Sequence, residues 1–157
     1  MTQNPQNGNR QNGNQKSSQM AKQKSMSYPL MENAADELTA ASGRTINSVS
    51  LEAAAAGEVD AADLQISAST LRAQATLAEQ AGYRELAQNL QRAAELTAVP
   101  NQELLRMYEL MRPGRSNYSE LTQMADRLEQ EYSAPITANF VREAAEVYRN
   151  RNLLRRA

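Results

Sequence analysis

The sequence predicts an all-α protein: a compact bundle of four main helices with short helices before it and a disordered tail at the N-terminus. Apolar residues recur at spacings of three and four, and no segment shows the strict alternation of a half-buried strand. Aromatic residues make up only 4% of the 157. Alanine and leucine must therefore fill the core, which favours closely packed helices. This length fits one domain, which we place at residues 28–157.

Residues 1–27 form the tail. Eleven of these 27 residues are Asn or Gln, and the pattern Gln-Asn-Gly-Asn occurs twice. Ordering each residue costs about 1–2 kcal/mol of backbone entropy, and this segment has almost no apolar side chains to offset that cost. We expect it to be disordered.

The segment between the tail and the first main helix carries weak helical signals. An apolar stripe from Leu30 to Ala41 has helical spacing and predicts a short helix. Ser50 can cap a helix over residues 51–56 that Gly57 terminates. Asp60 can cap a further single turn.

Start and stop signals delimit the longer helices. Ser67 and Gly82 bound one helix, and the next runs from about Tyr83 to Thr97 before Pro100 interrupts the path. The next apolar stripe predicts a helix that ends at Pro113-Gly114. Ser116 caps the helix after it, and the last helix begins near Ser133-Ala134-Pro135. The predicted inward faces are Leu71, Ala75, Ala78 and Ala81; Leu86, Leu90, Ala93 and Leu96 or Thr97; Leu104, Leu105, Tyr108 and Met111; Leu121, Met124, Ala125, Leu128 and Tyr132; and Ile136, Phe140, Ala144 and Val147.

The residues that most often carry catalysis are scarce. The chain has no histidine and no cysteine, which removes the commonest general base, the commonest metal ligand and every thiolate. Of the nearest carboxylate pairs, Asp60 and Asp63 are better explained by helix capping, and Glu129 and Glu131 should point to different sides of a helix. No glycine spacing matches a phosphate-binding loop. We therefore expect no catalytic, cofactor-binding or metal-binding residue on this chain.

Charge is unevenly distributed along the chain. Residues 1–27 carry +4, residues 28–141 carry −8 and residues 142–157 carry +3. The C-terminal arginines fall in the last helical turns, where cations are favoured, and the acidic body would repel phosphate. We therefore expect a solvated or partner-facing helix end and no nucleic acid. No apolar run approaches 18 residues, so we expect no membrane span, and the absence of cysteine is compatible with the cytoplasm.

Several motifs in a fixed order give the chain a resemblance to a known family. They are Tyr28-Pro29-Leu30, Ile66-Ser67 with Thr70-Leu71-Arg72-Ala73-Gln74-Ala75, Arg92-Ala93-Ala94-Glu95-Leu96-Thr97-Ala98-Val99-Pro100, Leu110-Met111-Arg112-Pro113 with Arg115-Ser116, and Phe140-Val141-Arg142-Glu143-Ala144-Ala145. From Tyr28 onward the chain resembles the small, or gamma, subunit of the adenosylcobalamin-dependent diol and glycerol dehydratases. The tail lies outside this resemblance.

The resemblance implies a role that periodicity alone does not show. In this family large, medium and small chains form a dimer of heterotrimers, with the active site in the barrel of the large chain and the cobalamin between the large and medium chains. The reaction is a radical dehydration of a 1,2-diol, such as 1,2-propanediol or glycerol, to an aldehyde. The small chain braces the large chain and supplies no catalytic residue. A free-standing helical adaptor is the alternative from another class.

Two further expectations follow from the resemblance. Some related chains enter bacterial microcompartments through a short amphipathic N-terminal helix, but the extension here is rich in Asn and Gln. A microcompartment location would then depend on a partner subunit. For the contact with the large chain we predict Tyr28, Pro29, Leu30, Arg112 and Arg115, since aromatic, proline and arginine groups near helix ends suit an interface.

Four substitutions test the bracing role. An amide in place of Glu95 or Asp126 should leave turnover per assembled complex nearly unchanged. Alanine in place of Leu90 or Leu128 should lower the free energy of unfolding by about 2–5 kcal/mol if these leucines lie in the core.

Tyr28, Tyr83, Tyr118 and Tyr148 lie near predicted helix ends, where they either contact a partner or are half-buried in the chain itself.

Overall fold

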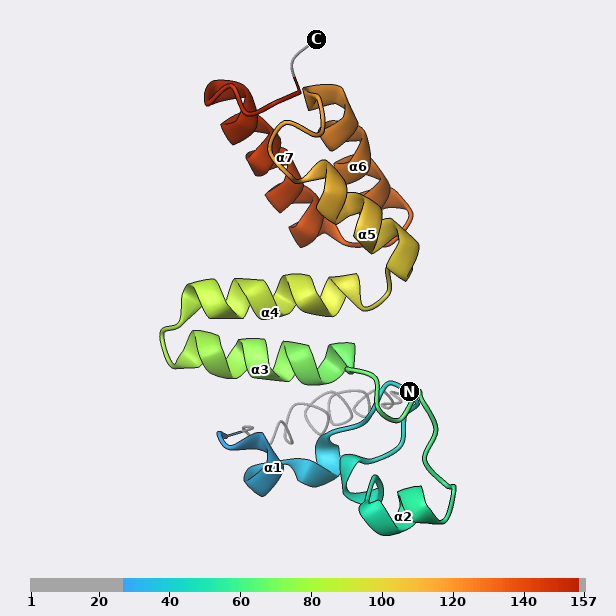
Figure 1. The fold of residues 1–157 in the computed structure, drawn as a ribbon. Helices are drawn as coiled ribbons and strands as arrows, with labels where there is room; N and C mark the ends of the chain where they lie inside the picture. The colour runs from blue at the N-terminus through green and yellow to red at the C-terminus, as the bar shows by residue number, and fades with distance from the viewer. Residues whose placement is uncertain (1–26, 156–157) are drawn as a thin grey trace, which may run out of the picture.

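The computed structural model describes residues 27–155, and within them the all-α prediction is confirmed (Figure 1). Five helices have ten residues or more, which adds one to the four main helices expected from the sequence. An isolated bridge between Thr39 and Thr45 is the only β-type pairing among the described residues. The helices are α1 (Leu30–Asn33), α2 (Leu51–Ala55), α3 (Ala68–Gln80), α4 (Arg84–Leu96), α5 (Asn101–Leu110), α6 (Tyr118–Gln130) and α7 (Pro135–Asn150), with single 3-10 turns at Ala35–Glu37 and Ile46–Ser48. The tail prediction lies outside the described residues except at Ser27.

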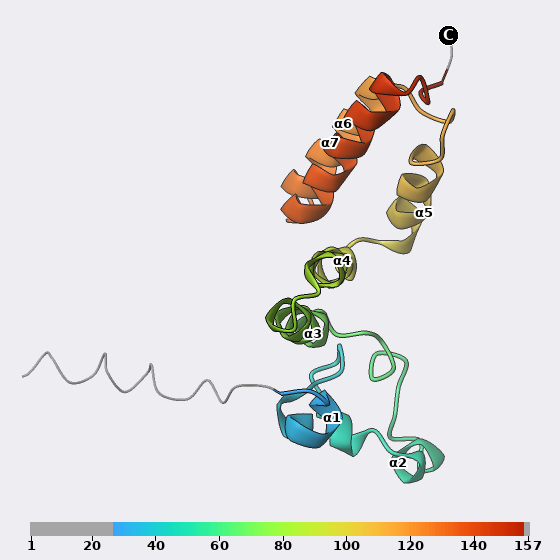
Figure 2. The same ribbon diagram turned by 90° about the vertical axis from the view of Figure 1, so that its left-hand side faces the viewer.

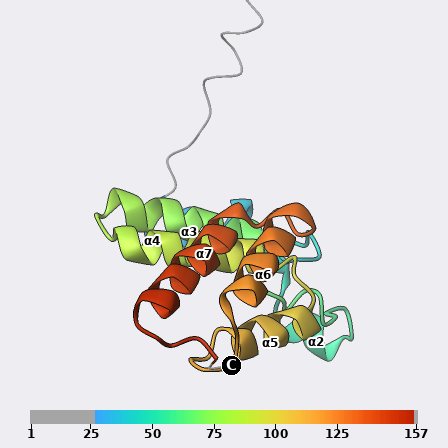
Figure 3. The ribbon, with the colours of Figure 1, turned by 90° about the horizontal axis from the view of Figure 1, so that it is seen from above.

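The helices follow one another in three parts (Figures 1 and 2). Residues 27–67 hold α1 and α2, the antiparallel pair α3–α4 comes next, and α5, α6 and α7 pack together at the other end. Figure 3 shows α6 and α7 side by side, and α7 also contacts α4. Two apolar cores result, one under α1 against α3 and a larger one among α5, α6 and α7.

Local signals set most helix boundaries as predicted. The Ser50 hydroxyl accepts a hydrogen bond from the Ala53 N–H at 3.2 Å and so caps α2. Gly82 follows α3 with a φ of +85°, a conformation that a residue without a Cβ adopts readily. Pro135 occupies the first turn of α7, where its missing N–H is not needed.

Two boundary predictions are wrong. The helix expected over Leu30 to Ala41 ends at Asn33, because Ala34 adopts a φ of −146° and Leu38 is extended. Leu38 and Ala34 are nevertheless buried. The apolar spacing therefore indicates which residues are buried, but it does not indicate a continuous helix. The cap of α6 is also one residue later than predicted.

Asn117, and not Ser116, caps α6. The Asn117 side chain accepts from the Glu120 N–H at 2.9 Å, and the Glu120 carboxylate accepts from the Asn117 N–H at 2.8 Å. This reciprocal pair is a capping box, and the spacing of Asn and Glu is its sequence signal. Ser116 is buried and donates its hydroxyl to the Leu110 carbonyl at 2.6 Å.

The predicted inward face is confirmed for α6 and wrong for α7. On α6, Leu121, Met124, Ala125 and Leu128 are at most 5% exposed. On α7 the buried residues are Thr137, Ala138, Val141 and Ala145, whereas Ile136, Phe140 and Val147 are exposed. Small side chains face α6 and bring the two helices close together, and the larger apolar side chains are left on the outside.

Ion pairs connect the helices of the C-terminal part. Arg127 of α6 contacts Glu103 of α5 at 3.1 Å and Glu131 at 3.3 Å. Its hydrogen bonds to Glu131 and Glu103 raise the pKa of the guanidinium above its ordinary value. Arg142 of α7 contacts Asp126 at 2.8 Å and Glu129 at 2.6 Å on α6. Glu129 and Glu131 therefore face different arginines, as predicted from their spacing.

Candidate partner interface

The five predicted interface residues fall into two groups at opposite ends of the molecule. Tyr28, Pro29 and Leu30 lie beside α3, whereas Arg112 and Arg115 lie in the loop from α5 to α6, next to the C-terminal segment. Tyr28 is 83% exposed, but Leu30 is only 8% exposed and packs with Ala34 and Leu38. Their contact with a partner stays a prediction.

An apolar groove runs between the Tyr28–Met31 segment and the α3–α4 pair. Its volume is about 680 Å³. Leu77 and Ala78 come from α3, Leu86 and Leu90 come from α4, and Ala81 and Tyr83 flank the turn between them. Leu86 is 50% and Tyr83 65% exposed. Leu86 and Leu90, two of the residues expected to face the core, thus line an open groove.

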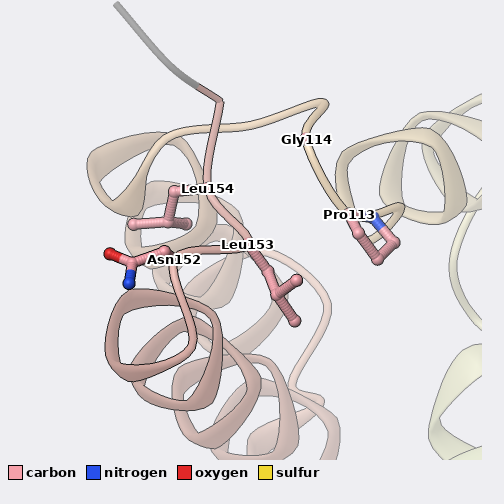
Figure 4. A pocket seen from close by; sticks show the side chains of 5 residues that line it. All are labelled: Pro113, Gly114, Asn152, Leu153 and Leu154. Carbon is pink, nitrogen blue, oxygen red and sulfur yellow. The ribbon is translucent and has the colours of Figure 1, made fainter.

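The Arg112–Arg115 loop is held by polar contacts. Glu109 accepts from Arg112 at 3.1 Å and pairs with Arg115 at 3.3 Å, and all three side chains are more than half exposed. Exposed pairs of this kind contribute little stability. The Gly114 N–H donates to the Leu153 carbonyl at 2.7 Å and ties the loop to the segment after α7. Beside it lies a shallow pocket of about 300 Å³ (Figure 4).

The sequence leaves two possibilities for the tyrosines near helix ends, contact with a partner or half-burial in the chain itself. In the structure two of the four are half-buried and two are exposed. Tyr118 and Tyr148 are half-buried: Tyr118 donates to Glu146, and Tyr148 donates to the Met111 carbonyl at 2.5 Å. The carboxylate of Glu146 raises the pKa of the Tyr118 hydroxyl, with burial adding to the effect. Tyr28 and Tyr83 are exposed and remain available to a partner. Tyr108, expected in the core, is 61% exposed.

Many large apolar side chains lie on the surface, and alanine supplies much of the core. Among the residues that the structure describes, ten of the 18 buried apolar residues are alanine, and 12 large apolar residues are exposed. Single exposed apolar residues are ordinary, whereas a contiguous apolar surface marks a contact with another molecule. The apolar groove beside Tyr28 is such a surface and is therefore a candidate contact site.

The carboxylate pair Asp60 and Asp63 has a structural role. The Asp60 side chain accepts from the Ala62 and Asp63 N–H groups, so the predicted capping of a single turn is confirmed. Asp63 accepts the Ser42 hydroxyl at 2.5 Å and the Asp60 N–H at 3.0 Å, and its side chain is only 4% exposed. It joins the loop around Gly43 to the turn before α3.

These contacts predict an acid-dependent loss of stability. The Ser42 hydroxyl, the Asp60 N–H and Arg44 lower the pKa of Asp63 below its ordinary 3.8. A carboxyl whose folded-state pKa is depressed stabilises the fold above its unfolded pKa, and the effect is lost as pH falls through the folded pKa. The variant Asp63→Asn should unfold at a lower temperature than wild type at pH 7, with the difference shrinking below about pH 4. Thermal unfolding at a series of pH values measures this.

The exposed Glu58 supplies the control for this prediction. Glu58→Gln should unfold like wild type at every pH. A difference between Asp63→Asn and wild type that stays constant from pH 7 to pH 3 would contradict the role assigned to the ionised carboxylate.

One structural contact was missed from the sequence. Glu95 of α4 accepts from the Ile136 N–H at 3.0 Å and the Thr137 N–H at 2.7 Å, both at the N-terminus of α7. The Thr137 hydroxyl also donates to Glu95 at 2.7 Å. A capping group 41 residues away leaves no local signal, so the sequence pattern could not reveal it.

Comparison with known proteins identifies the family. Residues 23–155 match the family model described as the dehydratase small subunit. The chain belongs to this family. The chain is 44% identical over 128 residues to the propanediol dehydratase small subunits of Salmonella typhimurium and Citrobacter freundii, and the match covers 82% of this chain and 74% of each relative.

Family membership confirms the resemblance drawn from the motifs. The matched region contains the motif segments from Tyr28 to Ala145. Among the described residues, no three His, Cys, Asp or Glu side chains are placed to hold a metal ion. None of the described helices combines the length and apolar character that a membrane span requires.

Proposed function

We propose that this chain is the small subunit of an adenosylcobalamin-dependent propanediol dehydratase, a complex that converts 1,2-diols to aldehydes. The 44% identity to two propanediol dehydratase small subunits carries the proposal. The 12 large apolar side chains exposed among the described residues are compatible with the same role, because subunit interfaces bury apolar and aromatic residues.

The proposed task of the chain is to brace the large subunit. Large, medium and small chains would assemble as a dimer of heterotrimers, with the reaction confined to the large chain. Three polar residues illustrate structural roles: Glu95 caps α7, Asp63 accepts from Ser42, and Arg142 connects α7 to α6. None of these side chains is left free for proton transfer to a substrate.

We propose that this chain does not bind cobalamin by itself. The sequence has neither histidine nor cysteine to act as a cobalt ligand. The groove beside Tyr28 is lined almost entirely by apolar side chains, whereas a corrin carries many amide groups that need hydrogen-bonding partners. We therefore assign the cofactor to the large and medium subunits.

Co-expression with the genes for the large and medium chains tests the proposal. The tagged small chain should co-purify with both in fixed stoichiometry, and the complex should dehydrate 1,2-propanediol only when adenosylcobalamin is added. The small chain alone should be inactive. Preference for glycerol over 1,2-propanediol would indicate a glycerol dehydratase, and a stable monomer that never joins the complex would indicate an adaptor.

The proposed location is the cytoplasm, within the assembled enzyme. Entry into a microcompartment would depend on a partner subunit, because the one candidate stripe in this chain, from Leu30 to Ala41, contributes Leu30, Ala34 and Leu38 to an intramolecular core. Deleting residues 1–26 should then leave the distribution of the complex in fractionated cells unchanged.

A further inference from the structure

Arginines gather at one end of the molecule, where the loop from α5 to α6 meets the segment after α7 (Figure 1). Residues 106–120 and 146–155, which we call the basic end, carry six arginines and three glutamates. The other described residues carry six arginines against 15 carboxylates. The basic end is therefore positive on a chain that is otherwise acidic. Its charged residues are Arg106, Arg112, Arg115, Arg149, Arg151, Arg155, Glu109, Glu120 and Glu146.

Specific contacts hold three of these arginines close to one another. Glu109 pairs with Arg112 at 3.1 Å and with Arg115 at 3.3 Å. Arg155 donates to the Arg115 carbonyl at 3.2 Å and pairs with Glu120 at 3.1 Å. The three arginine side chains are at least half exposed, so these pairs contribute little stability, while like charges brought together repel one another. The stability of the chain therefore does not explain the cluster.

The arginines keep donors available for a ligand. Among the described residues, ion pairs engage one nitrogen of Arg112 and one of Arg115, whereas a guanidinium has five N–H donors. The planar fork of these donors matches a carboxylate through two parallel hydrogen bonds. Glu109 and Glu120 already place carboxylates on this surface. The groups that the basic end holds in its own chain are thus the groups it would recognise in another.

The shallow pocket of about 300 Å³ belongs to the same surface (Figure 4). Pro113 from the loop and Leu153 and Leu154 from the segment after α7 line it. The hydrogen bond from the Gly114 N–H to the Leu153 carbonyl holds its two sides together. An apolar side chain in this pocket would leave water while its neighbours in sequence reach the arginines. A polypeptide with an apolar residue among acidic ones has this pattern.

We propose that the basic end binds an acidic segment of a partner protein, with an apolar residue of that segment in the shallow pocket. Nucleic acid fits this surface less well, because its unbroken row of phosphates would lie against Glu109, Glu120 and the acidic remainder of the chain. The separate carboxylates of a peptide can instead alternate with these two glutamates. The inference goes beyond the proposed function and does not depend on it, since it follows from the charges and the pocket of this chain.

Peptide binding to the purified full chain tests the proposal. The probe is a short fluorescent peptide of glutamates around one central leucine, and fluorescence anisotropy measures its binding. We expect an affinity that falls as the salt concentration rises, because exposed charges are screened. The variant Arg112→Gln/Arg115→Gln should bind about tenfold or more weakly, since it loses hydrogen bonds between charged groups. Both side chains are more than half exposed, so the variant should fold normally, which urea unfolding checks.

Two controls separate the effect of charge from the effect of the pocket. Arg72→Gln/Arg84→Gln removes the same charge from exposed positions on α3 and α4, and this variant should bind the peptide like wild type. A peptide with serine in place of its leucine should bind at least about threefold more weakly, because it has no apolar side chain to bury.

Several outcomes would overturn the proposal. They are no binding by wild type, equal binding by the Arg112→Gln/Arg115→Gln variant, an equal loss in the control variant, equal binding of the leucine and serine peptides, and tighter binding of inorganic polyphosphate or double-stranded DNA. Sedimentation velocity tests a second copy of the chain as the occupant: self-association that Arg112→Gln/Arg115→Gln abolishes would also overturn the proposal. None of these outcomes alters the co-purification expected from the proposed function, so the two can fail separately.

Discussion

Replacing Leu128 with alanine is expected to lower the free energy of unfolding by about 2–5 kcal/mol. Leu128 is 1% exposed and lies in the core formed by α5, α6 and α7, where Leu121 and Val141 are equally buried. Truncation removes apolar contacts and leaves a cavity that the surrounding alanines cannot fill. Urea unfolding of the full chain, followed by circular dichroism, measures the change.

The matched control is Leu90→Ala, which the sequence pattern placed in the core but the structure places beside the groove. Because Leu90 is half-buried, its truncation should cost less than about 2 kcal/mol. In the co-expressed enzyme, Leu128→Ala should reduce the amount of complex without changing turnover per assembled complex. Similar unfolding energies for the two variants would contradict the core assigned here.

The helix boundaries were largely predictable because their causes are local. Ser50 lies three residues before the residue whose N–H group it caps, and Gly82 follows Ala81, the residue that caps the end of α3. The failure at Leu30 to Ala41 has a different origin. An apolar spacing of three and four shows which residues are buried, and here a single helical turn, a 3-10 turn and an extended residue bury Leu30, Ala34 and Leu38 together.

The inward face of α7 could not be predicted because the helix has two apolar faces. One, with Ile136, Phe140 and Val147, carries the larger side chains, and the usual expectation is that larger side chains lie inside. The buried face instead carries Ala138 and Ala145, both 0% exposed. Both faces carry apolar residues at helical spacing. Periodicity cannot separate the two.

The lining of the apolar groove was predictable only in part, and its contact with a partner stays a prediction. Tyr28 and Pro29 do line the apolar groove, but the rest of the groove comes from α3 and α4. Leu86 and Leu90 looked like ordinary core positions because helix packing, and not local sequence, decides what covers them. The cap that Glu95 provides for α7 depends on tertiary structure in the same way, and it leads to the second large effect we expect.

Removing the Glu95 carboxylate should destabilise the junction of α4 and α7. Glu95→Ala leaves the Ile136 and Thr137 N–H groups without their acceptor and removes a negative charge from a helix N-terminus. We expect a loss of about 1.5–3 kcal/mol, the range for hydrogen bonds to a charged group. Glu95→Gln should lose less, because its one oxygen can still accept one of these bonds. Urea unfolding of both variants measures the difference.

A double-mutant cycle shows whether the loss arises at this contact. Thr137→Val removes the hydroxyl that donates to Glu95, so the two substitutions should show a coupling energy of about 0.5–3 kcal/mol. Glu143→Gln, at an exposed position on α7, should have no effect. Turnover per assembled complex should remain at the wild-type level in Glu95→Gln, because this carboxylate is engaged by the backbone of its own chain. A large fall in turnover with unchanged stability would mean that Glu95 takes part in the reaction and that its contact with the N-terminus of α7 is not its main role.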